Sequence, residues 1–257
     1  MTKKKDMAMR GWWLGLAAGL AVTPAMAEDL WQGSVGAGVL VTPEYLGSDD
    51  MRTRAWPSLE LRYGDAFYFN PREGLGWNAI REGNWVVSPY LGYTFGRDNR
   101  GELAAFEEVD GGATLGLRVS YDQGPWRYSL SGESAVTGDV NGSDWQARAT
   151  WRAPLDERTF VTLGPSVSYS SASWTRAMFG VSAEDSARSG LTAYEPGSGY
   201  LRYGLSGTVS YALTPAWSLT ALAGVTYLSG DAADSPIVDD VGDSLQPVVG
   251  AFISYRF

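Results

Sequence analysis

The stretch that ends the chain, Leu245 to Phe257, reads LQPVVGAFISYRF. Every second position toward its end is apolar, at Val249, Ala251, Ile253, Tyr255 and Phe257, and small or polar residues lie between them at Gly250, Ser254 and Arg256. Successive side chains of a β-strand point to opposite faces, so this alternation predicts a strand with one apolar and one polar face. A membrane-crossing strand needs roughly 9 to 11 tilted residues, and this stretch is long enough to supply them.

The same alternation recurs along the chain and predicts twelve strands. They are expected at residues 31–42, 52–63, 66–70, 75–80, 84–96, 111–121, 125–136, 144–153, 159–169, 200–212, 216–229 and 245–257. The third and fourth are short, and ten strands remain if 71–74 is a turn within one bent segment. In lipid a sheet must close on itself to pair its backbone groups. The predicted fold is therefore all-β, a closed antiparallel transmembrane β-barrel.

A soluble β-sandwich also alternates, but the aromatic residues favour a barrel. Trp and Tyr occupy apolar positions near both ends of the predicted strands, as the two interfacial girdles of a membrane barrel require. Those residues include Trp31, Trp85, Trp126, Trp145, Trp151, Trp217, Tyr63, Tyr93, Tyr121, Tyr211 and Tyr255.

Residues 1–27 have the features of a secretory signal peptide. A basic start that includes Lys3 and Arg10 precedes an apolar stretch at 11–22, and small residues follow up to Ala27. Cleavage is expected between Ala27 and Glu28, which leaves one barrel domain at 28–257. The apolar stretch is too short to be a spanning helix.

The predicted connections alternate in length, which indicates how the barrel is oriented. Short turns are expected at 64–65, 81–83, 122–124, 154–158 and 213–215, and long loops at 43–51, 97–110, 171–199 and 230–244. Barrels of the Gram-negative outer membrane have short periplasmic turns and long outer loops. The longest loop also contains a helix signal at 183–189, with Ser182 as its cap and Gly190 at its end.

Composition excludes several classes of function. The chain has 20 basic and 29 acidic residues. The signal segment takes four basic and one acidic residue, so 28–257 carries 16 arginines, 28 acidic residues and a net charge of −12. This charge argues against a nucleic-acid partner. The chain has no histidine or cysteine, so His-dependent hydrolases and thiolate sites are excluded. We expect no enzyme activity, no cofactor and no metal site, because the acidic loop 231–243 does not match the EF-hand pattern.

Charged residues on the polar faces of the strands are the candidate functional residues. They are Arg54, Glu60, Arg62, Arg118, Arg127, Glu133, Arg148, Arg152, Arg202 and Arg256. One interpretation is a network of guanidinium and carboxylate groups that fills a narrow lumen. The other is an anion-preferring pore lined by arginine.

The two terminal aromatic residues, Tyr255 and Phe257, predict an assembly signal. A terminal aromatic after alternating apolar residues resembles the signal read by the outer-membrane assembly machinery, because the last strand offers unpaired backbone groups until it meets the first. The expected surroundings are outer-membrane lipid and lipopolysaccharide.

Several loop motifs resemble the MipA/OmpV family, the MltA-interacting protein-like outer-membrane proteins. They are PEYLGSD at 43–49, FGRD at 95–98, FGVS at 179–182, SGLTAY at 189–194, GDAADSPIV at 230–238 and the terminal SYRF at 254–257. The resemblance implies an outer-membrane protein without catalytic residues. It also implies a scaffold that links a lytic transglycosylase to a murein synthase through periplasmic turns such as 154–158. Porin-like or adhesin-like members of the family imply the alternative, a small-solute channel or surface receptor.

Overall fold

The computed structural model describes residues 30–257, so the predicted cleavage site at Ala27 and Glu28 lies outside the described residues. The described chain forms thirteen strands: β1 (Trp31–Pro43), β2 (Met51–Tyr63), β3 (Phe67–Asn70), β4 (Gly74–Trp77), β5 (Ile80–Glu82), β6 (Trp85–Thr94), β7 (Gly112–Gln123), β8 (Trp126–Ala135), β9 (Ser143–Pro154), β10 (Thr159–Ser170), β11 (Tyr200–Ala212), β12 (Trp217–Leu228) and β13 (Leu245–Arg256).

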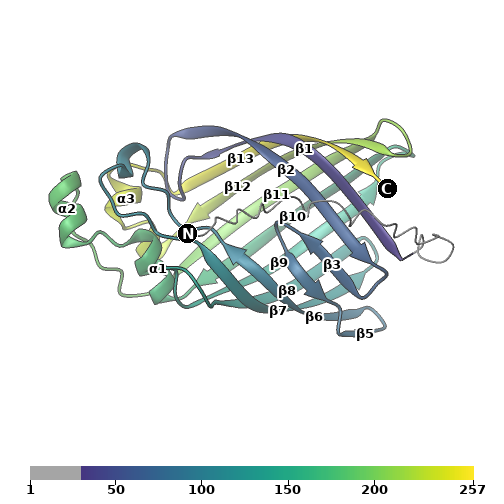
Figure 1. The fold of residues 1–257 in the computed structure, drawn as a ribbon, viewed down its shortest axis with the longest axis horizontal. Coiled ribbons are helices and arrows are strands. Elements are labelled where there is room, and N and C mark those ends of the chain that lie inside the picture. The colour runs from purple at the N-terminus through teal and green to yellow at the C-terminus, as the bar shows by residue number, and fades with distance from the viewer. Residues whose placement is uncertain (1–29) are drawn as a thin grey trace, which may run out of the picture.

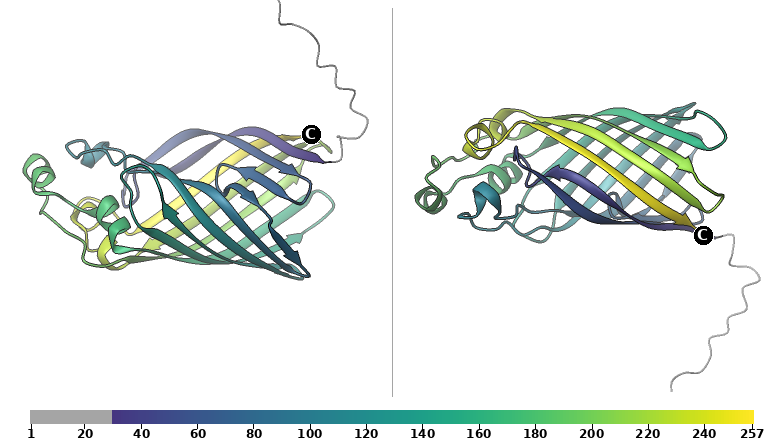
Figure 2. Two further views of the ribbon diagram at one scale, coloured as in Figure 1. Left: turned by 60° about the horizontal axis from the view of Figure 1, so that its bottom comes forward. Right: turned by 90° about the horizontal axis from the view of Figure 1, so that it is seen from above.

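The strands close into a ring (Figures 1 and 2). Neighbours are antiparallel and mostly sequential, β1 pairs with β13, and β4 closes the circle by pairing with β6. Both β4 and β5 pair with β6, with only Asn78 and Ala79 between them, so they share one position in the wall. The predicted closed twelve-stranded antiparallel barrel is confirmed. The described residues include no helix long and apolar enough to cross a bilayer.

The outside of the barrel is apolar, as the alternation requires. Residues such as Val39, Leu115 and Leu205 are each about half exposed there. Aromatic rings from neighbouring strands pack against each other, tilted, at the end that carries the C-terminus; these pairs are Trp31 with Tyr63, Trp85 with Tyr121, and Trp217 with Tyr255. This is the position of an interfacial girdle, and the short turns at this end, such as 155–158 and 213–216, place it on the periplasmic side of the outer membrane.

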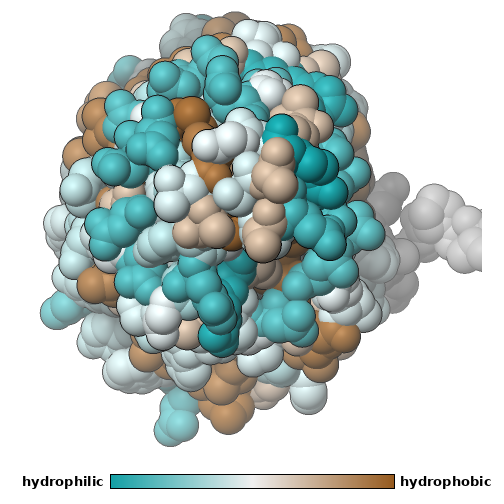
Figure 3. Space-filling view, turned by 90° about the vertical axis from the view of Figure 1, so that its left-hand side faces the viewer, coloured by the Kyte–Doolittle hydropathy of each residue, from teal (hydrophilic) through white to brown (hydrophobic). Residues whose placement is uncertain are grey.

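The compact hydrophobic core lies in the long outer loops and not in the barrel. These loops contain α1 (Ala172–Phe179), α2 (Ala183–Ser189), α3 (Pro236–Asp239) and the 3₁₀ turns η1 (Gly101–Leu103) and η2 (Gly230–Ala232). Two buried hydrophobic clusters hold these helices and turns together. The first cluster consists of Val140, Trp174, Met178, Phe179, Tyr200, Leu228, Ala232 and Val238. The second cluster consists of Tyr45, Leu103, Phe106, Val181 and Ile237. We call this packed layer the cap. It covers the outer mouth with mostly hydrophilic side chains on its surface (Figure 3).

The predicted helix at 183–189 is confirmed as α2. The side chain of Ser182 accepts a hydrogen bond from the backbone N–H of Asp185, and Gly190 ends the helix with a left-handed φ of 82°. Glycine adopts this conformation without a steric cost, which is why it commonly ends helices.

Candidate functional site

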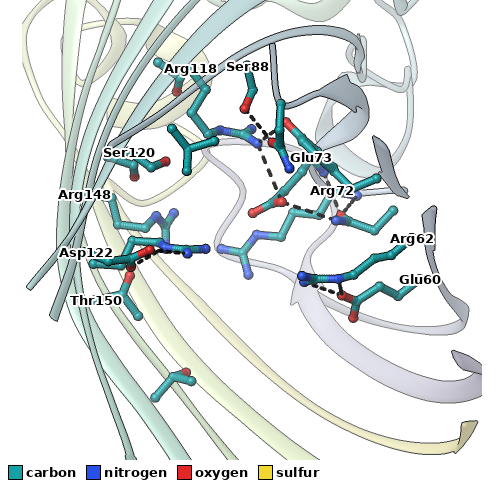
Figure 4. Close-up of a pocket in the computed structure, with 18 of the residues that line it drawn as sticks. Glu60, Arg62, Arg72, Glu73, Ser88, Arg118, Ser120, Asp122, Arg148 and Thr150 are labelled. Atoms are coloured by element: carbon teal, nitrogen blue, oxygen red, sulfur yellow. Dashed lines mark hydrogen bonds and ion pairs between the residues drawn. The ribbon is translucent and has the colours of Figure 1, made fainter. Parts of the chain in front are cut away.

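The candidate site is the polar lumen, which holds three adjoining cavities. The inner cavity, of about 820 Å³, lies toward the periplasm and is lined by residues from β1 to β12 (Figure 4). Near its periplasmic end Asp122 accepts hydrogen bonds from Arg127 at 2.6 and 2.8 Å and from Arg152 at 2.7 Å. One carboxylate thus joins the guanidinium groups of two strands, β8 and β9, to β7.

Arg118 projects into the same cavity from β7. Its guanidinium donates to the hydroxyl of Tyr68 at 2.9 Å, lies 3.6 Å from Glu73 and sits 4.8 Å from the centre of the Tyr90 ring. Both Glu73 and Arg72 belong to the tip of the short β3–β4 hairpin, which ends inside the lumen.

Two arginines of this cavity have no carboxylate partner among residues 30–257. Arg148 donates to Gln146 and Ser206, and the side chain of Arg72 forms no ion pair. Figure 4 shows Arg148 and Arg72 reaching into the cavity from opposite walls. The middle of the lumen therefore carries uncompensated positive charge.

The outer cavity, of about 750 Å³, lies beneath the cap and is lined in part by Trp174 and Met178 of α1. Glu133 accepts hydrogen bonds there from Tyr90 at 2.9 Å and Thr114 at 3.2 Å. Asp144 accepts one from Ser170 at 2.6 Å and pairs with Arg202.

Three donors that line the outer cavity are buried without a hydrogen-bond partner in the described structure. They are the Tyr200 hydroxyl and the Nε atoms of Arg54 and Arg202. Tyr200 is only 1% exposed. Unpaired buried donors cost free energy, so these three groups are a local cost to the stability of the outer end of the barrel.

The third cavity, of about 640 Å³, lies between β2, the hairpin tip and β13. In it Arg62 pairs with Glu60 at 2.7 Å, and Arg256 forms no ion pair with residues 30–257. Nine of the ten residues predicted for the lumen line one of the three cavities, and the tenth, Arg152, binds Asp122.

The sequence analysis missed several lumen residues. Asp122 and Asp144 fall at strand ends, where a turn was expected for Asp122, although they keep the inward parity of Arg118 and Arg148. Nothing in the sequence shows that the hairpin tip with Arg72 and Glu73 turns inward.

Charged groups also hold the cap together. Arg97, 4% exposed, donates to the carbonyl of Met178 at 2.9 Å, and burial lowers the pKa of its guanidinium. Burial also raises the pKa of Tyr45 to about 12. Burial alone would raise the pKa of Asp185, but hydrogen bonds from Ser182, Arg188 and the backbone N–H of Glu107 outweigh burial and lower it.

The acidic residues at 231–243 are used inside the loops. Asp231 accepts from the backbone N–H of Ser198 at 2.6 Å, which lowers its pKa, and Asp243 accepts from the backbone N–H of Leu245 at 2.7 Å. Over residues 30–257, no three acidic side chains gather into a group that would hold a metal ion.

Tyr255 and Phe257 lie where the last strand meets the first. Tyr255 is opposite Val35 and its ring packs at a tilt against Trp217, while Phe257 exchanges backbone hydrogen bonds with Gly33 at 3.0 and 3.3 Å. These pairings close the barrel at its seam.

A sequence profile of the family described as MltA-interacting protein MipA matches residues 35–257. The chain belongs to the MipA family. It is 29% identical over 267 residues to the MltA-interacting proteins of Escherichia coli K12 and Shigella flexneri, with each chain fully covered. Among solved structures, a NanC porin gives a TM-score of 0.45 at 9% identity, covering 86% of this chain and all of the porin. An outer membrane channel from Pseudomonas putida F1 gives 0.45 at 11%, covering 89% and 95%.

Proposed function

We propose that this MipA-family barrel is a non-enzymatic scaffold that binds murein-cleaving and murein-synthesising enzymes at its periplasmic end. The name of the two relatives, MltA-interacting protein, supports a murein enzyme as partner. The cap supports the same role, because it covers the outer mouth and leaves the periplasmic end as the accessible one.

The observation that carries the proposal is an exposed apolar pair on two adjacent periplasmic turns. Leu155, in the β9–β10 turn, is 63% exposed, and Leu213, in the β11–β12 turn, is 45% exposed. A hydrogen bond of 2.8 Å from the backbone N–H of Ala212 to the carbonyl of Arg158 joins the two turns. Neighbouring exposed large apolar side chains on surface turns are candidates for contact with another protein.

The first of these turns is rigid. The carboxylate of Asp156 accepts hydrogen bonds from the backbone N–H groups of Arg158 and Thr159 and from the Thr159 hydroxyl, at 2.7 to 2.8 Å. The same bonds lower the pKa of Asp156. A preorganised turn loses little conformational entropy on binding, which favours a stable complex.

The test is retention of a purified lytic transglycosylase and a purified murein synthase on the immobilised protein in detergent. We expect retention by the wild type and a loss of at least tenfold for Leu155→Ser combined with Leu213→Ser. Val136→Ser is the matched control, because this residue is also half exposed but lies at the outer end. No retention by the wild type, or equal loss in the control, refutes the proposal.

A second candidate function is passage of small anions, and the uncompensated charge of Arg72 and Arg148 favours it. Planar-bilayer recording tests it directly. A conductance that prefers anions, and that loses this preference in Arg148→Gln combined with Arg72→Gln, supports a channel. A silent bilayer refutes a channel and leaves the scaffold unaffected.

A further inference from the structure

The wall of the barrel is incomplete beside β2. All thirteen residues of β2 pair with β1 on one side, but on the other side only Leu61 to Tyr63 pair with β3. Across the opening, β6 meets β4 only through Tyr90 and Leu91. Because the β3–β4 hairpin is short, the outer part of β2 faces no strand of the described chain, and the far wall is visible between β2 and β6 in Figure 1.

This interval is an opening and not a packed contact. The 640 Å³ cavity is lined by Pro57 and Leu59 from the outward face of β2, by Pro71 at the hairpin tip, and by Phe252 and Ser254 inside the lumen. Leu59 is opposite Val35, which is 49% exposed on the lipid-facing surface. The cavity therefore joins the lumen to the outside of the wall.

Side chains close the interval at its outer end. Arg52 and Arg54 lie 3.8 and 3.7 Å from Asp98, and the Trp56 and Phe95 rings meet edge to face with centroids 6.0 Å apart. The result is a window bounded by the hairpin tip below and these contacts above.

The lumen wall beside the window is apolar, in contrast to its surroundings. The inward positions of four adjacent strands, β2, β1, β13 and β12, carry Trp56, Leu40, Val248, Phe252 and Leu222. Most other inward positions are Ser, Thr, Gly or charged residues. We call these five residues the apolar patch.

Two glycines make the patch possible. Gly38 lies between Trp56 and Phe252 in register, and a Cβ atom there would overlap the Phe252 ring. Gly250 makes the same room for the side chain of Leu40. The two glycines therefore let large apolar side chains lie flat against the wall and face the lumen, where Trp56 and Phe252 line the 640 Å³ cavity and Leu40 and Val248 line the outer cavity.

Three arginines flank the patch: Arg72 and Arg256 have no carboxylate partner among residues 30–257, whereas Arg54 lies 3.7 Å from Asp98. Arg72 and Arg256 line the 640 Å³ cavity. Arg54 is opposite Leu40, and its Nε is buried without a hydrogen-bond partner. An alkyl chain suits the patch and an anionic head suits the arginines, and the volume is within the roughly 300–1,000 Å³ of small-molecule sites.

We propose that the window between β2 and β6 is a lateral entrance through which a single-chain anionic amphiphile passes from the membrane into the lumen. Its alkyl chain lies on the apolar patch, and its head group pairs with Arg72 and Arg256. At membrane depth, unpaired backbone groups are tolerated only where they are buried in protein or line a water-filled cavity. At the window, the unpaired edge of β2 lines the 640 Å³ cavity.

Binding of the fluorescent fatty acid parinaric acid to the full protein in neutral maltoside micelles tests the site. We expect saturable binding that weakens at least tenfold in Phe252→Ser and in Arg72→Gln combined with Arg256→Gln. Leu163→Ser, on the lipid-facing surface of β10, is the control and should bind as the wild type does. Absence of saturable binding, or equal weakening in the control, overturns the proposal.

Competition identifies the head group. Displacement by lysophosphatidylglycerol or by a fatty acid supports the proposal, and the tighter competitor names the source of the anion. Equal displacement by zwitterionic lysophosphatidylcholine overturns the role of the arginines.

A second experiment tests the entrance itself and does not depend on the variants of the lumen. The chain has no cysteine, so Pro57→Cys at the rim and Leu163→Cys on the far wall can each be labelled with a bulky polyethylene-glycol maleimide. We expect the label at position 57 to slow association of parinaric acid at least tenfold and the label at 163 to leave it unchanged. Equal rates overturn the lateral route.

Discussion

Replacing Phe179 by alanine should open the cap and leave the barrel closed. Phe179 is fully buried at the C-terminal end of α1, and its ring meets the Tyr200 ring at 5.1 Å between centroids and 75° between planes. Truncating a buried phenylalanine to alanine costs about 3–5 kcal/mol through lost burial and the cavity that remains.

The cost should fall on the cap alone, because the two buried clusters lie in the outer loops and only a few members belong to strand ends. Loops open locally with their own free energies, independently of global unfolding. At about 1.4 kcal/mol for each factor of ten, the loss raises the population of the open cap by roughly 10²- to 10⁴-fold.

Trypsin cleavage of the reconstituted protein measures this opening, since Arg176 and Arg188 lie in the cap. We expect Phe179→Ala to be cleaved at least 100-fold faster than the wild type, while the barrel still migrates as a compact, heat-modifiable band. Phe160→Ala, which truncates a phenylalanine that is 43% exposed at the other end, should be cleaved at the wild-type rate. A rate in Phe179→Ala equal to that of this control would refute the reasoning.

Three further predictions concern pH, packing and assembly. Because the pKa of Asp185 is lowered, its carboxylate stabilises the cap fully above about pH 4, and this stabilisation is lost as the pH falls through the lowered pKa. Hydrogen exchange of α2 should therefore accelerate from pH 5 to pH 3 beyond the intrinsic effect of pH. Asp185→Asn should abolish that extra acceleration. Gly116→Ala should lower the temperature at which the heat-modifiable band is lost, because its Cβ would overlap the Tyr90 ring, whereas Gly197→Ala has open space and should not. Phe257→Ser should reduce the folded fraction produced by the purified assembly machinery, and an unchanged fraction would count against the terminal signal.

The strands were predictable because a membrane barrel repeats one simple rule. Alternation of apolar and polar residues sets both the pairing and the facing of each strand, so residues 31–42 and 245–257 were expected almost as they are observed in β1 and β13. The third and fourth strands were also expected, and they were expected to be short because their alternating pattern is brief and Pro71 interrupts it. The local sequence was sufficient to predict those strands whose position and facing depend only on the alternation within the strand.

Of the two helices in the longest loop, the local sequence predicts one and not the other. Ser182 and Gly190 marked α2, because its cap and its C-terminal turn need those residue types. The helix α1 was not anticipated. The side chain of its N-cap Ser171 makes no capping hydrogen bond to the helix backbone and instead accepts one from the backbone N–H of Ser143. The first turn has no acidic residue, and the helix depends on burial of Trp174 and Met178 against distant loops.

The apolar patch could not be predicted from the sequence. Leu40 and Phe252 lie in strands whose outward residues are also apolar, so these inward residues do not stand out from the lipid-facing ones in the sequence. Alternation places them on the lumen face, but the room for their side chains comes from Gly250 and Gly38, which lie opposite them on the neighbouring strand. One strand alone does not show this pairing. The unpaired edge of β2 also could not be predicted, because it depends on which strands pair with β2 in the closed barrel.

The cap and the window together decide which routes into the lumen exist. A solute outside the cell meets the packed cap, whereas a membrane amphiphile meets the window in the wall, beneath the contacts of Arg52 and Arg54 with Asp98. Opening the cap with Phe179→Ala should therefore raise ion conductance and leave the association rate of parinaric acid unchanged. If both change together, the amphiphile enters through the mouth, and the window is not the entrance.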